Sequence, residues 1–156
     1  MAWGVGTRSQ THSKGGAKGA SSGFSSNFEQ RIAVQLTAAK VKFEYETRTI
    51  RYVKPEENCR YTPDFILPNG IIIEVKGLWE TADRKKHKLI RAQYPHLDIR
   101  MVFSNSHSTI GKKSTTTYAM YCNALGIPHA DRQIPVSWLT EPYGEKRHAA
   151  LLAATR

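Results

Sequence analysis

The chain has 156 residues, enough for one domain with its own hydrophobic core. Its 23 lysines and arginines outnumber 13 acidic residues, and a formal net charge of +10 indicates a polyanionic partner, most simply nucleic acid. The sequence lacks an apolar run that could cross a membrane and the apolar segment of a secretory signal, while Cys59 and Cys122 lack metal-ligand spacing. We therefore expect a cytoplasmic protein with two free thiols.

Residues 1–26 are rich in glycine and serine, include Lys14 and Lys18, and hold no acidic residue. Such a segment buries too little surface to offset the entropy cost of ordering it. We predict a flexible basic tail in which Lys14 and Lys18 contact DNA. A flexible arm without a function is the alternative.

A helix is predicted to begin at Asn27, a residue suited to a helix N-cap. Glu29 lies in its first turn, where a favourable interaction with the helix dipole can explain an acid. Residues 41–53 alternate in the manner of a strand with one solvent-exposed face, and a polar segment follows at 54–60. The helix is indicated by apolar residues at helical spacing, which are Phe28, Ile32, Leu36 and Ala39.

The remaining elements follow from apolar runs and from helix start and stop signals. A strand, a helix and a second strand in succession predict a right-handed crossover and a parallel strand pair. We expect strands at 61–67, 71–76 and 98–104, helices at 81–93 and 114–125, a short helical turn at 135–140 and a weaker helix at 144–155.

The hairpin of the first two of these strands carries three charged residues in an apolar setting. Glu74 and Lys76 share a face by the two-residue period of a strand. A two-residue loop would place Asp64 on the opposite face, whereas a three-residue loop pairs Asp64 with Glu74. Residues 68–70 are Pro-Asn-Gly, which suits the three-residue loop because glycine can take its left-handed position.

Two paired carboxylates repel each other unless a cation lies between them. Asp64, Glu74 and the backbone carbonyl of Val75 suit Mg²⁺ or Mn²⁺. Lys76 could activate a water molecule or stabilise negative charge on a phosphate. A salt bridge on a solvent-exposed sheet face is the alternative, but the neighbouring side chains are apolar.

Pro63-Asp64, followed after nine residues by Glu74-Val75-Lys76, matches the PD-(D/E)xK nuclease signature. We therefore expect an α/β fold of that class, with a mixed central sheet flanked by helices. A more specific resemblance rests on seven segments: "KFEYE", "YTPDF", "LPNGI", "EVKGLWE", "DRKKH", "LDIR" and "VFS". In order and spacing, from about Ser26 to Pro142, the chain resembles phage endonuclease I, the T-seven type Holliday-junction resolvase.

The resemblance implies a catalytic set of Glu29, Asp64, Glu74 and Lys76, with two metal ions per active site and Glu29 near the second ion. It also implies cleavage of four-way junctions and other branched DNA, leaving 5′-phosphate and 3′-hydroxyl ends. The homodimer would be intertwined, with each active site shared between subunits.

Domain boundaries follow from the same comparison. We expect the nuclease domain at 27–142, with 52–60 bridging the two subunits, because nine residues can extend roughly 30 Å. An ordinary loop within one subunit is the alternative. Residues 143–156 would be a C-terminal extension, since they replace the strongly basic C-terminus of the family.

Further basic residues are candidates for phosphate contacts. They are Arg84, Lys85, Lys88 and Arg91 in the helix at 81–93, and Lys112 and Lys113 before the next helix. A solvated charged face is the alternative for the helix.

Two other functions stay open at this point. One is a sequence-specific nuclease of the same superfamily. The other is a non-catalytic DNA-junction binding protein with a degenerate site, although the intact set of two acids and a lysine argues against it.

Overall fold

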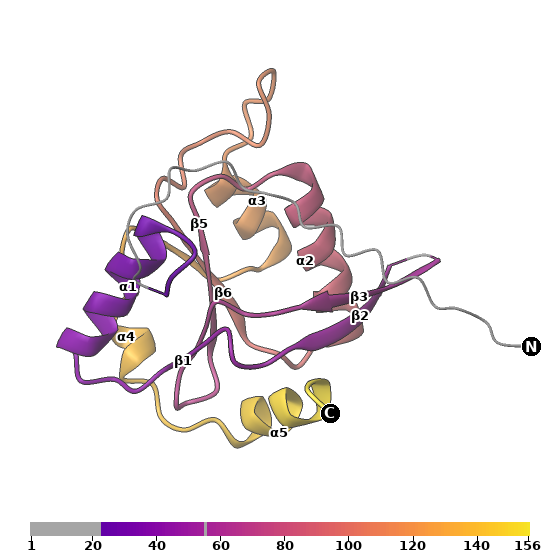
Figure 1. Ribbon diagram of the computed structural model, residues 1–156. Helices are drawn as coiled ribbons and strands as arrows, with labels where there is room; N and C mark the ends of the chain where they lie inside the picture. The colour runs from indigo at the N-terminus through magenta and orange to yellow at the C-terminus, as the bar shows by residue number, and fades with distance from the viewer. Residues whose placement is uncertain (1–22, 55) are drawn as a thin grey trace, which may run out of the picture.

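A mixed five-stranded sheet forms the centre of the structure (Figure 1), which is a computed structural model describing residues 23–54 and 56–156. The first three strands in sheet order pair antiparallel, and the last three pair parallel. This confirms the predicted mixed sheet and the parallel pair on either side of the helix at 81–93. The sheet order is β1 (Glu44–Tyr45), β4 (Phe65–Ile66), β5 (Ile72–Lys76), β6 (Ile99–Phe103) and β7 (His129–Asp131).

Helices cover both faces of the sheet because alternate residues of its strands are buried on opposite sides. Ile73 and Val75 of β5 pack with α1 (Asn27–Ala38), and α4 (Val136–Leu139) joins them. Ile72 faces the other side, in a core shared with Ile90 and Leu151. Those residues belong to α2 (Thr81–Gln93) and α5 (Glu145–Ala154), and α3 (Tyr118–Leu125) lies over the neighbouring part of β6.

A two-stranded hairpin of β2 (Ile50–Lys54) and β3 (Glu57–Tyr61) packs beside α2. The single strand expected at 41–53 is therefore split into β1 and β2. Glu46 causes the break, since its φ of 48° turns the backbone out of the extended conformation. Of the segment 52–60, residues 52–54 belong to β2 and residues 57–60 to β3.

The β4–β5 hairpin has the predicted three-residue turn. Phe65 lies opposite Ile73 and Ile66 opposite Ile72, which excludes the two-residue loop. Gly70 takes the left-handed position, with a φ of 85°. Asp64 directly precedes Phe65, the first residue of β4, so the same register places it opposite Glu74.

Two helix starts differ from the prediction. Ser26 rather than Asn27 caps α1, because the Ser26 hydroxyl accepts a hydrogen bond from the Glu29 amide at 3.1 Å. The helix expected from Ser114 begins at Tyr118 and is capped by Thr117. The run of β-branched threonines after Ser114 loses side-chain freedom in a helix, so the chain stays in a loop there.

The C-terminal helix α5 is part of the fold rather than a separate extension. Leu151 and Ala154 are buried against the core of the β2–β3 hairpin and α2. Arg147 ties α5 to the β4–β5 turn by donating to the Asn69 carbonyl at 3.1 Å. Within residues 23–54 and 56–156, no helix combines the length and apolar character needed to cross a membrane.

Candidate active site

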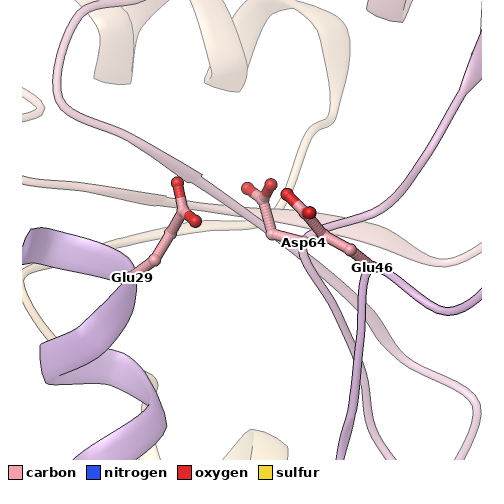
Figure 2. A group of neighbouring side chains, drawn as sticks. All are labelled: Glu29, Glu46 and Asp64. Carbon is pink, nitrogen blue, oxygen red and sulfur yellow. The ribbon is translucent and has the colours of Figure 1, made fainter. Parts of the chain in front are cut away.

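Three acidic side chains from separate elements converge at one edge of the sheet (Figure 2). Glu29 comes from α1, Glu46 from the bend after β1, and Asp64 from the bend before β4. One carboxylate oxygen from each lies within 4.8 Å of the others. The sequence pointed to Glu29 and Asp64 but not to the exposed Glu46, because the bend that carries Glu46 has no residue signature such as glycine.

Local contacts fix the buried Glu29 carboxylate. The Tyr45 hydroxyl donates to Oε2 at 2.6 Å, and the Ser26 hydroxyl donates to Oε1 at 3.0 Å. The Ser25 amide adds a third donor at 3.2 Å. Burial, together with the hydrogen bond to Glu29, raises the pKa of Tyr45, so this hydroxyl keeps its proton and stays a donor. The carboxylate is thus oriented by the first turn of α1 and by β1.

Asp64 is oriented by the sheet itself. The Val75 amide donates to Asp64 Oδ2 at 2.8 Å, and the Asp64 carbonyl accepts from the Glu46 amide at 3.1 Å. Burial raises the pKa of Asp64 well above its usual range, and the negative charge of Glu74 adds to the shift. Burial and the neighbouring carboxylate therefore both disfavour the charged form of Asp64.

Glu74 lies deeper, on the face of β5 that packs against α2. The Tyr61 hydroxyl donates to Glu74 Oε2 at 2.8 Å, and Lys76 Nζ lies 3.1 Å from Oε1. His87 Nε2 lies 3.4 Å from the same oxygen. Burial alone would raise the pKa of Glu74, but the contacts with His87 and Lys76 outweigh it and hold the pKa below its usual range.

Lys76 shares this buried setting and also approaches Asp83, with Nζ 3.8 Å from its carboxylate. Burial acts to lower the pKa of Lys76, yet the charges of Glu74, Asp83 and Asp64 outweigh it and raise the pKa. The salt bridge weighed as an alternative thus exists between Glu74 and Lys76. It is not on a solvent-exposed face, because their exposed fractions are 2% and 6%.

The structure therefore brings the four sequence-derived residues into one region but in two groups. Glu29 and Asp64 join Glu46 in the carboxylate cluster, while Glu74 and Lys76 form the buried pair behind it. His87 was not anticipated. Its helical spacing from Ile90 places it on the buried side of α2, where its Nε2 faces the Glu74 carboxylate.

The cluster fits a hard divalent cation. Its donors are all carboxylate oxygens, the ligand type that Mg²⁺ and Mn²⁺ prefer. A divalent ion beside Asp64 would also favour its charged form, against the burial and the Glu74 charge that raise its pKa. Glu29, Glu46 and Asp64 are the residues that would hold it.

The predicted DNA-contacting residues of α2 divide into two pairs. Arg84 is buried and donates to the Trp79 and Ile110 carbonyls, and Arg91 donates to the Ile99 carbonyl. These hydrogen bonds hold part of each guanidinium within the protein, and the predicted DNA contacts of Arg84 and Arg91 stay predictions. Lys85 and Lys88 are exposed.

The other predicted contacts lie away from α2. Lys112 and Lys113 are exposed, but they belong to a loop turn and not to a helix N-terminus. Lys14 and Lys18, with most of the predicted tail, lie outside the described residues.

Comparisons with known proteins agree with the resemblance seen in the sequence. A family model described as Phage endonuclease I matches residues 9–155. The chain is 52% identical over 117 residues to Endonuclease I of Escherichia phage T7, covering 75% of this chain and 78% of that protein. It is 53% identical over 117 residues to Endodeoxyribonuclease 1 of Enterobacteria phage T3, covering 75% and 77%. The chain belongs to the phage endonuclease I family.

Proposed function

We propose that the protein is a metal-dependent, structure-selective endonuclease that resolves four-way DNA junctions and cuts other branched DNA. Family membership makes it an endodeoxyribonuclease. The observation that carries the proposal is the convergence of Glu29, Glu46 and Asp64 beside the buried pair of Glu74 and Lys76. The products would carry 5′-phosphate and 3′-hydroxyl ends.

Mg²⁺ or Mn²⁺, two ions per site in this proposal, would supply an activated water and a Lewis acid for the phosphate. The carboxylate cluster would hold them, with Glu74 and the Val75 carbonyl as further oxygen donors and Glu29 nearest the second ion. The hydrogen bonds to Glu29 and Asp64 keep both carboxylates in place before the substrate arrives.

Lys76 has a different part in the reaction. Its ammonium lies against Glu74 and near Asp83, so it is held as a cation at a fixed position. A fixed positive charge in a buried setting stabilises the negative charge that develops on the phosphate oxygens. We therefore assign Lys76 to transition-state stabilisation. Lys76→Ala should lower the cleavage rate by orders of magnitude while junction affinity changes little.

The proposed substrate is tested by comparing a labelled four-way junction with a linear duplex of the same arm sequence. We expect Mg²⁺-dependent cleavage of the junction, loss of cleavage in EDTA, and much slower cleavage of the duplex. Asp64→Asn should abolish cleavage and retain junction binding, because neutralising a carboxylate does not repel phosphate. Glu57→Gln, in the exposed Lys54–Glu57 pair, is the matched control.

Other outcomes of this experiment favour the competing functions. Equal cleavage of duplex and junction at one fixed sequence favours a sequence-specific nuclease. Junction binding without cleavage at any Mg²⁺ concentration favours a non-catalytic junction-binding protein.

We further propose a homodimer whose active sites are shared. In one chain, the β2–β3 hairpin connects the elements that carry Glu29 and Glu46 to those that carry Asp64 and Glu74. If this hairpin opens, β2 can pair with β3 of a second copy and keep the same local contacts, as in domain swapping. Glu56 at the tip has a φ of 69°, so opening would relieve an unfavourable backbone conformation.

A mixed dimer tests this arrangement, with Glu29→Ala in one subunit and Glu74→Ala in the other. If sites are shared, one site collects both substitutions and the other is intact, so the mixed dimer nicks one strand of a junction. An inactive but correctly assembled mixed dimer would contradict sharing and leave the catalytic residues unaffected.

We place this activity in the cytoplasm of the host cell. Cys59 and Cys122 are free thiols, as expected from the sequence, and free thiols are compatible with a reducing compartment.

A further inference from the structure

A cavity lined by arginines lies between the β2–β3 hairpin and the end of α5. It has a volume of about 400 Å³, and Figure 1 shows the C-terminal end of α5 beneath the hairpin. Four arginines and three threonines line it, and no acidic side chain does. The arginines are Arg48, Arg51, Arg60 and Arg156.

Arg51 and Arg60 lie directly opposite each other across the hairpin, and both are exposed. Like charges in this position destabilise a hairpin. Neither guanidinium has an ion-pair partner within residues 23–54 and 56–156, whereas Arg48 pairs with Glu44 at 2.7 Å. The hairpin thus keeps an uncompensated pair of positive charges at the cavity, which an anionic ligand would neutralise.

The chemistry of the lining favours phosphate oxygens as that anion. A guanidinium presents a planar set of donors that matches two oxygens of a phosphate group. The Thr47 and Thr155 hydroxyls already donate to Glu44 and to the Leu151 carbonyl, so the guanidinium groups are the donors that would hold the anion.

Two residues that line the cavity are close in the chain or in space to residues of the carboxylate cluster. Thr47, one of its lining residues, directly follows Glu46. Thr49, another, lies with its hydroxyl 3.4 Å from that of Thr62, two residues before Asp64. A DNA strand with one phosphodiester at the cluster would therefore bring a phosphate farther along the same backbone to the arginines.

We propose that this cavity, centred on Arg51 and Arg60, is a phosphate-binding subsite for a DNA strand next to the cleaved bond. The inference rests on the proposed function, since it takes the ligand to be the backbone of the DNA substrate. The hairpin keeps two opposed arginines, at a cost in stability, because they bind this backbone.

The test measures binding of a fluorescein-labelled four-way junction in EDTA at several salt concentrations. The double variant Arg51→Ala/Arg60→Ala should lower the slope of log K against log salt by about 1.8, at about 0.9 for each lost phosphate contact. The matched control Lys54→Ala/Lys146→Ala removes two exposed charges from the same hairpin and α5, but outside the cavity. It should leave the slope near the wild-type value.

Two results would overturn the proposal. One is an unchanged slope in the arginine double variant, and the other is an equal fall in the lysine control. Because binding is measured without metal, the result is separate from cleavage. If the wild-type protein cleaves the junction but the arginine double variant has an unchanged slope, only the subsite is contradicted. If the slope falls in the double variant but the wild-type protein does not cleave in Mg²⁺, only the proposed reaction is contradicted.

A second variant distinguishes binding from a structural role. Arg60→Glu converts the opposed like charges into a cross-strand ion pair, so the melting temperature should rise while junction affinity falls. A structural role for Arg60 would instead lower the melting temperature. Junction affinity equal to that of the wild type would also overturn the proposal.

Discussion

Glu74 and Lys76 are ionisable residues inside the core, where an unpaired charge would be expensive. Each is tolerated because the other lies 3.1 Å away and because Tyr61 donates to the second Glu74 oxygen. The chain thus keeps two charges behind the carboxylate cluster, where solvent screens them little. Their positions are set by the alternation of β5, which the sequence showed directly.

Removing the Tyr61 hydroxyl tests how much this buried contact matters. Tyr61→Phe leaves Glu74 Oε2 without its donor at 2.8 Å, and we expect a loss of about 1–3 kcal/mol in the free energy of unfolding. Urea denaturation measures the loss. Tyr143→Phe, at a residue 65% exposed, is the control and should change stability little. Equal stability of both variants would contradict the role given to this hydrogen bond.

Some site residues could be predicted from the sequence, and others could not because their positions depend on the backbone conformation of the folded chain. Asp64, Glu74 and Lys76 followed from strand period and turn type, and Glu29 followed from the family resemblance. Glu46 could not be found in this way, because a positive φ at a glutamate is set by packing around it. The hydrogen bonds of Arg84 and Arg91 to the Ile110 and Ile99 carbonyls could not be read from the helical pattern either, because they depend on how the chain packs after α2.

Among the secondary-structure elements, the β4–β5 turn was the best specified by sequence. Pro68, Asn69 and Gly70 each suit one position of the three-residue turn. Asn69 does more than form the turn, since its amide donates to the Trp138 and Glu141 carbonyls at 2.9 and 3.1 Å. The turn therefore fixes the strand register and anchors the segment leading to α5.

Gly70→Ala tests this element. A side chain there meets an unfavourable φ of 85°, and its Cβ would lie 3.0 Å from Arg147 Cβ. We expect a loss of about 1–3 kcal/mol in unfolding free energy. Gly111→Ala is the control, since a Cβ there meets nothing within 4 Å, and it should stay within about 0.5 kcal/mol of wild type. A Gly70→Ala protein as stable as the control would contradict the account of the turn.

Other elements were less predictable for identifiable reasons. The alternation through residues 41–53 indicated one strand, but the bend at Glu46 sends β1 and β2 into different sheets. The strand β7 has three residues, too few to give a periodic pattern, and it forms by parallel pairing with β6. Both features depend on contacts between segments distant in the sequence.

The mixed central sheet flanked by helices was predictable from sequence, whereas the packing of the last residues was not. The hydrophobic pattern of α5 is weak, so the helix was taken for an extension, yet Leu151 has an exposed fraction of only 1%. Its packing surface is made by β2, β3 and α2, which only the folded chain brings together.

Two adjacent leucines give a matched test of this assignment. Leu151→Ala should lower the unfolding free energy by about 2–5 kcal/mol, because it leaves a cavity in the core. Leu152→Ala should change it by less than about 0.5 kcal/mol, because Leu152 is 50% exposed. Thermal and urea unfolding would give both values. If both substitutions lower the unfolding free energy by less than about 0.5 kcal/mol, the packing role given to α5 is contradicted.

The central claim, that the cluster of Glu29, Glu46 and Asp64 holds the metal for DNA cleavage, is tested most directly by the Mg²⁺ dependence of single-turnover junction cleavage. Glu46→Gln should need at least about tenfold more Mg²⁺ for half its maximal rate, because it removes a carboxylate from the cluster. The exposed Glu57→Gln control should follow the wild-type curve, and all three proteins should bind the junction in EDTA. A Glu46→Gln enzyme with the wild-type rate and Mg²⁺ dependence would contradict the claim.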